Sequence, residues 1–476
     1  MRGDNDRSAV STQCTSTERA VCLLLPLAVC FLCFIWSLRL PVEMAPDESM
    51  RLMIPFYIVE HGRLPIGSDP AIRNSIWGTS YGFVPYTPSL ISALFIKFFE
   101  LFSSDVNVLI TAARFVDPLF AGLTVYVCEQ IGLRIYGRDS SILLGLIVGL
   151  LPQFVFLGCY LNNDMFTIFC SSLVILGWIK GWQQHWDRNS SLFLGASLGL
   201  TAISYYFAYG YLLISVAYYF ISSSLMADSA HSSKSAGKRV LRGAIVIALV
   251  AFAIGGWFFV RNIILYDGDV FGMRTSASFS ELYAKDGFKP SQHTSPDDFG
   301  ISPLAMIFGN GSNSWLVVSL KSSIGVFGML NIFLPRLLYL AYGAFFGVGF
   351  LLWVHKAYVS IRTSEKYKIL LFACLILAML VPFVLSAYYS WSSDYQAQGR
   401  YFSSGFIPMF ILVTSGYREL ASCVSKCQHD GLVTAERKIE LPRRVTGPSA
   451  MVMVAVVYIA LFLATFISTI LPYCMQ

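Results

Sequence analysis

Apolar stretches of about 18 to 25 residues recur along the chain, separated by polar segments. Each is long enough to cross a hydrocarbon core roughly 30 Å thick as an α-helix, whose backbone satisfies its own hydrogen bonds in lipid. The pattern predicts an all-α integral membrane protein with about eleven transmembrane helices. The predicted helices cover residues 20–40, 107–133, 140–160, 164–182, 191–204, 206–224, 242–262, 336–354, 368–389, 401–417 and 449–472.

One further apolar stretch, residues 84–102, is interrupted by Lys97 and Glu100. If it does not cross, eighteen Lys and Arg residues fall in loops on the cytoplasmic side, as the positive-inside rule requires. If it crosses, all of them move outside. We therefore predict that 84–102 is an amphipathic helix at the outer interface, where Lys97 extends to the headgroups.

This topology divides the chain into a cytoplasmic tail, a transmembrane domain, a basic cytoplasmic loop and a last helix. The first outer loop is expected to carry juxtamembrane helices. The boundaries are 1–19 for the tail, 20–420 for the transmembrane domain with outer loops 41–107, 262–335 and 390–400, 421–448 for the basic loop and 449–476 for the last helix.

Composition narrows the class of protein. Hydrophobic residues make up 55% of the 476 residues and charged residues 13%, against about 25% charged in soluble domains. This excludes a soluble enzyme. The net charge of +6 comes from the short loops, so it indicates topology and no nucleic-acid partner.

Two carboxylates, Asp47 and Glu48, follow Pro46 directly after the first predicted helix. A carboxylate at the membrane boundary can have an altered proton affinity and face a substrate there. The alternative is an acidic pair that only marks the start of a helix.

A second acid stands in the outer turn formed by Asn162, Asn163 and Asp164. Asn and Asp are common turn and N-cap residues, which is one interpretation. The other is that Asp164 flanks the same cleft as the first acidic pair, because both lie on the outer face.

Cations stand at the same depth. Arg400, within Gln398–Gly399–Arg400–Tyr401, opens a predicted helix on the outer side, and Arg261 ends another. A guanidinium there can bind a phosphate with two hydrogen bonds, and the glycine permits close approach. The alternatives are an interfacial anchor for Arg400 and closure of a helix C-terminus for Arg261.

Other polar residues are weaker candidates. Arg114 and Asp117 lie one turn apart in the predicted helix 107–133, where we expect them to form an ion pair. His61, beside Glu60, is a candidate for metal binding or acid-base chemistry, although a single His is more often structural.

These motifs in their order resemble a bacterial family of multipass membrane proteins related to the GT-C glycosyltransferases. The resemblance covers residues 20 to about 420. It is carried by Pro46–Asp47–Glu48, Asn162–Asn163–Asp164, Gly256–Trp257 with Arg261–Asn262 and Tyr266–Asp267–Gly268, the run 323–335, and Gln398–Gly399–Arg400–Tyr401.

The resemblance implies transfer of a sugar from a polyprenyl-phosphate donor to a glycan, lipid or protein acceptor, with inversion, on the outer face of the cytoplasmic membrane. It implies Asp47 as the base. Many relatives have a His where this chain has Arg51, which argues against a metal-binding or acid-base role at that position. The resemblance fixes no cofactor, and a divalent metal ion stays an open alternative. The assigned roles are catalytic for Asp47, Glu48 and Asp164, donor-phosphate binding for Arg400 and Arg261, and acceptor binding or positioning for Asn163, Gln398, Tyr401 and His61.

Two other functions compete with the enzyme. A transporter or flippase of lipid-linked saccharide would also carry polar residues near the membrane, but transporters place charged sites near the bilayer midplane. In this sequence the acids collect at one face. A non-catalytic scaffold for polysaccharide assembly fits only if Asp47 lies outside a cleft.

Overall fold

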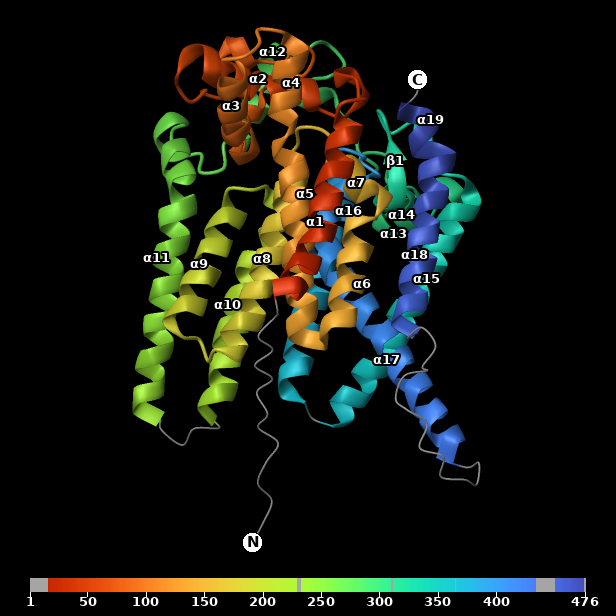
Figure 1. The fold of residues 1–476 in the computed structure, drawn as a ribbon. Coiled ribbons are helices and arrows are strands. Elements are labelled where there is room, and N and C mark those ends of the chain that lie inside the picture. Colours follow the sequence, from red (N-terminus) through yellow and green to blue (C-terminus); the bar gives the residue numbers. More distant parts are fainter. Residues whose placement is uncertain (1–15, 229–232, 310, 364, 434–449, 475–476) are drawn as a thin grey trace.

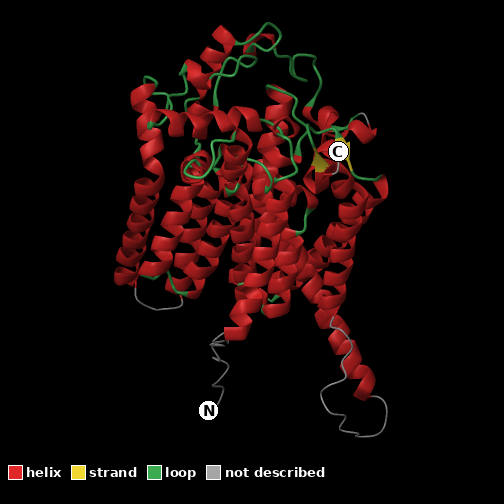
Figure 2. Cartoon of the chain, turned by 45° about the horizontal axis from the view of Figure 1, so that its top comes forward, coloured by secondary structure: helices red, strands yellow, loops and turns green. Residues whose placement is uncertain are grey.

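The computed structural model describes residues 16–228, 233–309, 311–363, 365–433 and 450–474. Long helices stand side by side in a bundle, and shorter helices and loops gather at one end (Figures 1 and 2). We call the part of that end formed by residues 41–105 and 266–294 the cap. The N-terminal side of the first helix lies at the opposite end of the bundle (Figure 1).

The bundle contains the predicted membrane helices. Within the described residues, seven helical segments are long and apolar enough to cross a membrane, which confirms a multi-pass membrane protein. Helices α1, α6, α9 and α17 run beside them (Figure 1), and the number of about eleven spans stays a prediction. The bounds are α1 Ser16–Ser37, α5 Val116–Tyr136, α6 Arg138–Gly149, α7 Pro152–Leu157, α8 Asp164–Gln183, α9 Arg188–Ala202, α10 Gly210–Asp228, α11 Ser233–Leu265, α15 Arg336–Arg362, α16 Lys366–Ser392, α17 Phe406–Val433, α18 Ala450–Thr465 and α19 Leu471–Cys474.

Shorter elements connect the bundle helices at the cap end. They are α2 Glu48–His61, α3 Thr87–Phe99, α4 Val106–Arg114, α12 Met273–Tyr283, α13 Pro303–Phe308, α14 Trp315–Gly325, β1 Val326–Phe327 and β2 Ile332–Phe333. The strands are antiparallel, with Val326 opposite Phe333. Among the described residues this two-residue ribbon is the one departure from the predicted all-α fold.

Helix α8 lies at the centre of the bundle. The apolar stretch of α8 is 78% buried inside the structure. The corresponding stretches of α11, α15 and α18 are 22% buried, and their apolar side chains face outwards. A helix that is apolar on all sides belongs either in a core or against lipid, so this difference separates the inner helix from the lipid-facing ones. The buried start of α8 is therefore well placed to hold a fixed polar group.

The cap forms from two loops far apart in sequence. The Lys285 amide donates to the Ile76 carbonyl at 3.0 Å, and the Arg73 guanidinium lies 3.7 Å from the Tyr283 ring centroid. Gly78 has a φ of +67°, and a Cβ there would lie 2.2 Å from the Ala284 nitrogen. Only glycine fits this close approach, which fastens the loops together.

The ambiguous stretch 84–102 forms α3, whose 13 residues are too few to cross a membrane. As predicted, it lies at the cap end beside α2 and α4 (Figure 1). Lys97 pairs with Glu100 at 2.9 Å on its surface.

Two predicted boundaries were wrong. The helix expected at 107–133 is found as one apolar span, Val106–Tyr136, with a turn at Phe115 between α4 and α5. The helix expected at 140–160, however, ends at Gly149 because Pro152 starts the separate α7. The basic loop expected from 421 is helical through Val433, and its remainder lies outside the described residues. Most of the predicted tail 1–19 also lies outside them.

Candidate active site

Asp47 and Arg400 meet although 353 positions separate them in the sequence. The Arg400 Nη2 donates to the Asp47 Oδ2 at 2.7 Å. The Arg400 side chain is 9% exposed and the Asp47 side chain 32% exposed, so the carboxylate is the more accessible partner. The pair lies where the start of the cap meets the segment before α17.

The backbone at Asp47 explains why the adjacent acids separate. Asp47 has φ +63° and ψ 0°, a left-handed conformation that costs a non-glycine residue energy, although Asp tolerates it better than most. Asp47 is the N-cap residue of α2, so the acidic pair does mark a helix start, but the Asp47 side chain makes no capping hydrogen bond. Glu48, the first residue of α2, therefore faces a different neighbour.

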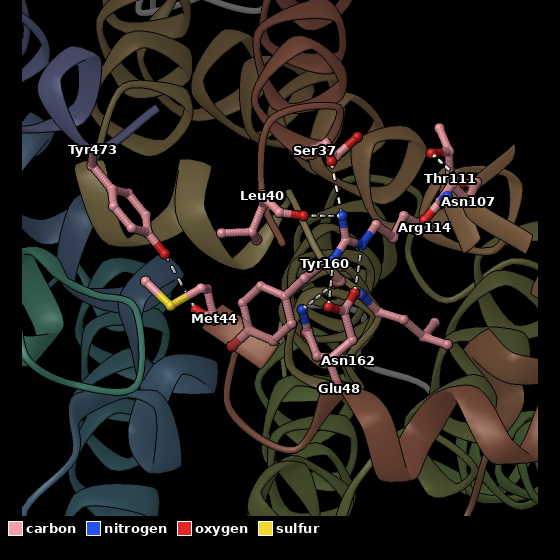
Figure 3. Close-up of polar contacts among 11 residues, drawn as sticks. Ser37, Leu40, Met44, Glu48, Asn107, Thr111, Arg114, Tyr160, Asn162 and Tyr473 are labelled. Carbon is pink, nitrogen blue, oxygen red and sulfur yellow. Dashed lines mark hydrogen bonds and ion pairs between the residues drawn. The ribbon is translucent and has the colours of Figure 1, made fainter. Parts of the chain in front are cut away.

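Glu48 is fully buried in a two-bond ion pair with Arg114 (Figure 3). The Arg114 Nε and Nη2 donate to the two Glu48 oxygens at 2.7 and 2.6 Å, and the Leu161 amide donates to Glu48 at 3.0 Å. Arg114 Nη1 also donates to the Ser37 and Leu40 carbonyls at 2.9 and 2.6 Å. The carboxylate and guanidinium of this pair thus connect the end of α1, the start of α2 and the end of α4.

The pair corrects one prediction and redirects another. Arg114 does not pair with Asp117, because its guanidinium is engaged by the two carboxylate oxygens of Glu48. Glu48, proposed from the sequence as catalytic, lies in the closed pair with Arg114, so we assign it a structural role.

We expect Arg114→Met to destabilise the fold by about 3–5 kcal/mol, because it leaves the Glu48 charge buried and unpaired. The double variant Arg114→Met/Glu48→Met removes both charges and should recover most of that loss. Thermal unfolding in detergent measures both variants. A single variant as stable as the unmodified protein would contradict this role.

Arg51 is a site residue that the sequence reasoning did not select. It lies one helical turn after Asp47, and its amide donates to the Asp47 carbonyl at 3.1 Å. Its guanidinium is buried 4.0 Å from the Tyr81 ring centroid and interacts electrostatically with Asp47 and Asp164. Its Nε has no hydrogen-bond partner. The available signal was the i, i+4 spacing, which places Arg51 one turn after Asp47.

Asp164 completes the charged group. It is the first residue of α8, is 4% exposed, and interacts electrostatically with Arg51 and Arg400. Asn162 and Asn163 hold the turn before it. The Asn162 Oδ1 accepts from the Met165 amide at 2.9 Å, and the Asn163 Nδ2 donates to a cap carbonyl, that of Pro85, at 2.7 Å.

Arg400 stands in a 3-10 segment, Gly399–Gly405, and α17 begins only at Phe406. The predicted helix start at 401 was therefore wrong. Gly399 lies against α14: its amide donates to the Ser322 Oγ at 2.5 Å, and a Cβ there would lie 2.2 Å from the Ser323 Oγ. The close approach predicted for this glycine is thus made to α14, and it fixes the backbone that carries Arg400.

Aromatic and amide side chains surround the Arg400 head. The Arg400 Nη2 donates to the Tyr401 hydroxyl at 3.3 Å, and that hydroxyl donates to the Gln396 Oε1 at 3.2 Å. The Gln398 Nε2 donates to the same Gln396 oxygen at 2.7 Å. Burial raises the pKa of Tyr401 to about 12, so this phenol stays neutral and available as a hydrogen-bond donor.

The electrostatics keep Asp47 ionised. Burial by itself would raise the pKa of Asp47, but Arg400 and Arg51, with hydrogen bonds from Arg400 and Tyr81, outweigh it. The pKa of Asp47 therefore lies below its ordinary value. We refer to Asp47, Arg51, Asp164 and Arg400 as the charged cluster.

Two sequence candidates lie elsewhere in the structure. The Arg261 Nη2 donates to the Pro65 carbonyl at 2.6 Å, which ties the cap to α11. The His61 ring stacks on the Tyr57 ring, with centroids 4.2 Å apart, at the end of α2. Neither interacts with the charged cluster in the contacts of the described residues, so the structure does not bring them to Asp47.

The charged cluster does not fit a resident metal ion. No three His, Cys, Asp or Glu side chains gather as ligands anywhere in the described part of the chain. In the charged cluster Asp47 and Asp164 interact with Arg51 and Arg400, and these two guanidiniums would repel a divalent cation. The reaction proposed below uses no metal.

Known proteins resemble this chain in sequence and in fold. The profile of the family described as dolichyl-phosphate-mannose-protein mannosyltransferase matches residues 87–257. This match covers about a third of the chain. It agrees with the predicted resemblance to membrane glycosyltransferases that use a lipid-phosphate sugar. No curated protein matches its sequence.

Solved structures show the shared fold. The archaeal oligosaccharyltransferase AglB from Archaeoglobus fulgidus, in complex with an inhibitory peptide and a dolichol-phosphate, superposes with a TM-score of 0.56 at 12% identity. This match covers 95% of the chain and 56% of AglB, so the chain spans about half the length of that protein. ArnT from Cupriavidus metallidurans in the apo state gives a TM-score of 0.47 at 14% identity, covering 94% of the chain and 76% of ArnT.

Proposed function

We propose that this GT-C relative transfers a sugar from a polyprenyl-phosphate donor to an acceptor hydroxyl, with inversion at the anomeric carbon. The contact between Asp47 and Arg400 carries the proposal, because it places a carboxylate and a guanidinium at one point beneath the cap. The acceptor is a glycan, lipid or protein, and the reaction takes place on the outer face of the bacterial cytoplasmic membrane.

The reaction needs both charges. The acceptor oxygen bonds to the anomeric carbon while the bond from that carbon to the phosphate oxygen breaks, and polyprenyl phosphate leaves with the electron pair. Asp47 takes the hydroxyl proton as general base. Arg400 and Arg51 stabilise the negative charge that develops on the leaving phosphate.

Donor binding can activate the base. In the protein alone, Arg400 is occupied by Asp47, which lowers the pKa of this carboxyl. A donor phosphate competes for the same guanidinium, so Asp47 loses its partner and its pKa rises. The carboxylate thus becomes a stronger base only when the sugar is in place. This exchange favours transfer over idle hydrolysis.

Other polar groups can orient the acceptor. Tyr401 and Gln398 lie beside Arg400, and Asn163 with Asp164 lies at the buried start of α8. We assign Tyr401, Gln398, Asn163 and Asp164 to binding and positioning of the sugar or acceptor. These assignments follow from their place around the charged cluster.

A reconstituted assay tests the function. The purified protein in liposomes is supplied with polyprenyl-phosphate sugars and with the same sugars as nucleotide conjugates, plus an envelope lipid or glycan extract as acceptor. We expect transfer only from the lipid-phosphate donor, with the product in the inverted configuration by NMR. Movement of the donor between leaflets without transfer would instead identify a flippase. If neither transfer nor movement of the donor is observed, the result would favour a non-catalytic scaffold.

A further inference from the structure

An apolar groove of about 690 Å³ lies outside the charged cluster, between α1, α3 and α4. Its walls include Phe34 of α1, Phe98 of α3 and Val108 of α4. Phe115 forms contacts to both sides, with ring centroids 5.4 Å from Phe34 and 5.3 Å from Phe95 in edge-to-face geometry.

Helix α3 presents large apolar side chains on its outer face. Leu94 is 72% exposed and Phe98 56% exposed, whereas Ser92 is buried together with Ile96. The Ser92 hydroxyl donates to the Ala113 carbonyl at 2.7 Å, which fixes the buried face against α4. A helix with large apolar residues on its outer face is stable against hydrocarbon.

The apolar surface continues on both sides of the groove. Leu101 and Phe102, after α3, are 74% and 73% exposed. Phe31 of α1 and Leu38, just after α1, are 64% and 49% exposed. Because α1 stands in the membrane bundle (Figure 1), this surface is continuous with the lipid-facing side of the bundle. The groove therefore opens toward the bilayer.

The groove is closed toward the charged cluster. Arg114, between the groove residues Ala112 and Phe115, is 3% exposed and is held by Glu48 and by carbonyls at the end of α1. A chain in the groove cannot therefore present its phosphate to Arg400 on the other side of this pair. The occupant is thus a different lipid from the donor.

We propose that this groove binds one acyl chain of a bilayer phospholipid. The apolar walls match a hydrocarbon chain, the opening faces lipid, and the exposed Lys97–Glu100 pair at the end of α3 marks the headgroup level. A lipid held here contacts residues of α1 and α4 beside the Arg114–Glu48 pair. It therefore stabilises the position of Glu48, which is adjacent to Asp47 in the sequence.

Photolabelling of the full protein tests this site. The protein is placed in nanodiscs containing phosphatidylcholine with a diazirine near the middle of one acyl chain, and labelled residues are mapped by mass spectrometry. Val108→Trp fills the groove. The matched control Val348→Trp adds the same bulk at a 48% exposed position of α15. Displacing two methylene groups of a bound chain weakens its binding roughly tenfold.

We expect labelling of α3 and α4 groove residues well above that of lipid-facing α15, and a fall of about tenfold in Val108→Trp with no change in Val348→Trp. Groove labelling equal to that of α15, or unchanged by Val108→Trp, overturns the proposal. Labelling by a diazirine-bearing polyprenyl phosphate in preference to the phospholipid overturns it too, since the groove would then hold the donor chain. The readout does not depend on transfer activity.

Discussion

Asp47→Asn should lower the rate of sugar transfer by about 10²–10⁴-fold, the contribution of a positioned general base. The amide keeps the size of the carboxyl and can still meet Arg400, but it cannot take the acceptor proton. The protein should therefore insert, fold and bind polyprenyl phosphate as before. Initial rates in the reconstituted assay, with donor binding measured separately, give the two quantities.

The control for Asp47→Asn is Asp286→Asn, which alters a cap carboxylate that is 90% exposed and pairs with Lys289. It should transfer sugar at the unmodified rate. Full activity of Asp47→Asn would reject the base assigned to this site. Loss of donor binding together with activity would indicate that Asp47 instead shapes the site.

The pH dependence follows from the sign of the shift in Asp47. Its pKa in the protein alone lies below the ordinary value of about 3.9, so the carboxylate is present above that value and is lost only as the pH falls through the lowered pKa. Asp47 thus contributes no acid limb to kcat/KM between about pH 5 and pH 8. The pH dependence of kcat reports the donor complex, in which Arg400 binds the phosphate and the pKa of Asp47 is higher. The acid limb of kcat therefore lies at a higher pH than that of kcat/KM.

Arg400→Gln should reduce transfer by about 10²–10³-fold, the usual loss when one preorganised donor to a developing anion is removed. It should also weaken polyprenyl-phosphate binding, because Arg51 alone then faces the phosphate. Arg400→Lys keeps the charge but loses the planar, two-bond geometry, so it should recover only part of the activity. Binding titrations and single-turnover rates separate these effects.

Arg261→Gln is the matched control for Arg400→Gln. Sequence reasoning placed both arginines at the donor phosphate, but the structure holds Arg261 on the Pro65 carbonyl instead. We expect its donor affinity to equal that of the unmodified protein. Equal losses in the two variants would show that the cap, rather than the Arg400 guanidinium, governs donor binding.

The sequence alone was enough to predict the membrane class and the place of the short apolar helix α3. Long apolar runs determine where transmembrane helices form, and the charge of the loops determines their orientation in the membrane. Both depend only on nearby residues and on the bilayer. Breaks were harder to predict. The turn at Phe115 does have a local signal, because Pro118 has no N–H to bond the Arg114 carbonyl, four residues before it.

The site divides in the same way. Residue type and the common outer face singled out Asp47, Asp164 and Arg400, but nothing local states that positions 47 and 400 touch. Only the packing of α2 and α14 against the segment before α17 decides that contact. The same packing pairs Glu48 with Arg114, places Arg51 in the charged cluster, and holds Arg261 and His61 away from it. Sequence alone does not determine this, because the direction of a side chain depends on backbone turns that distant neighbours stabilise.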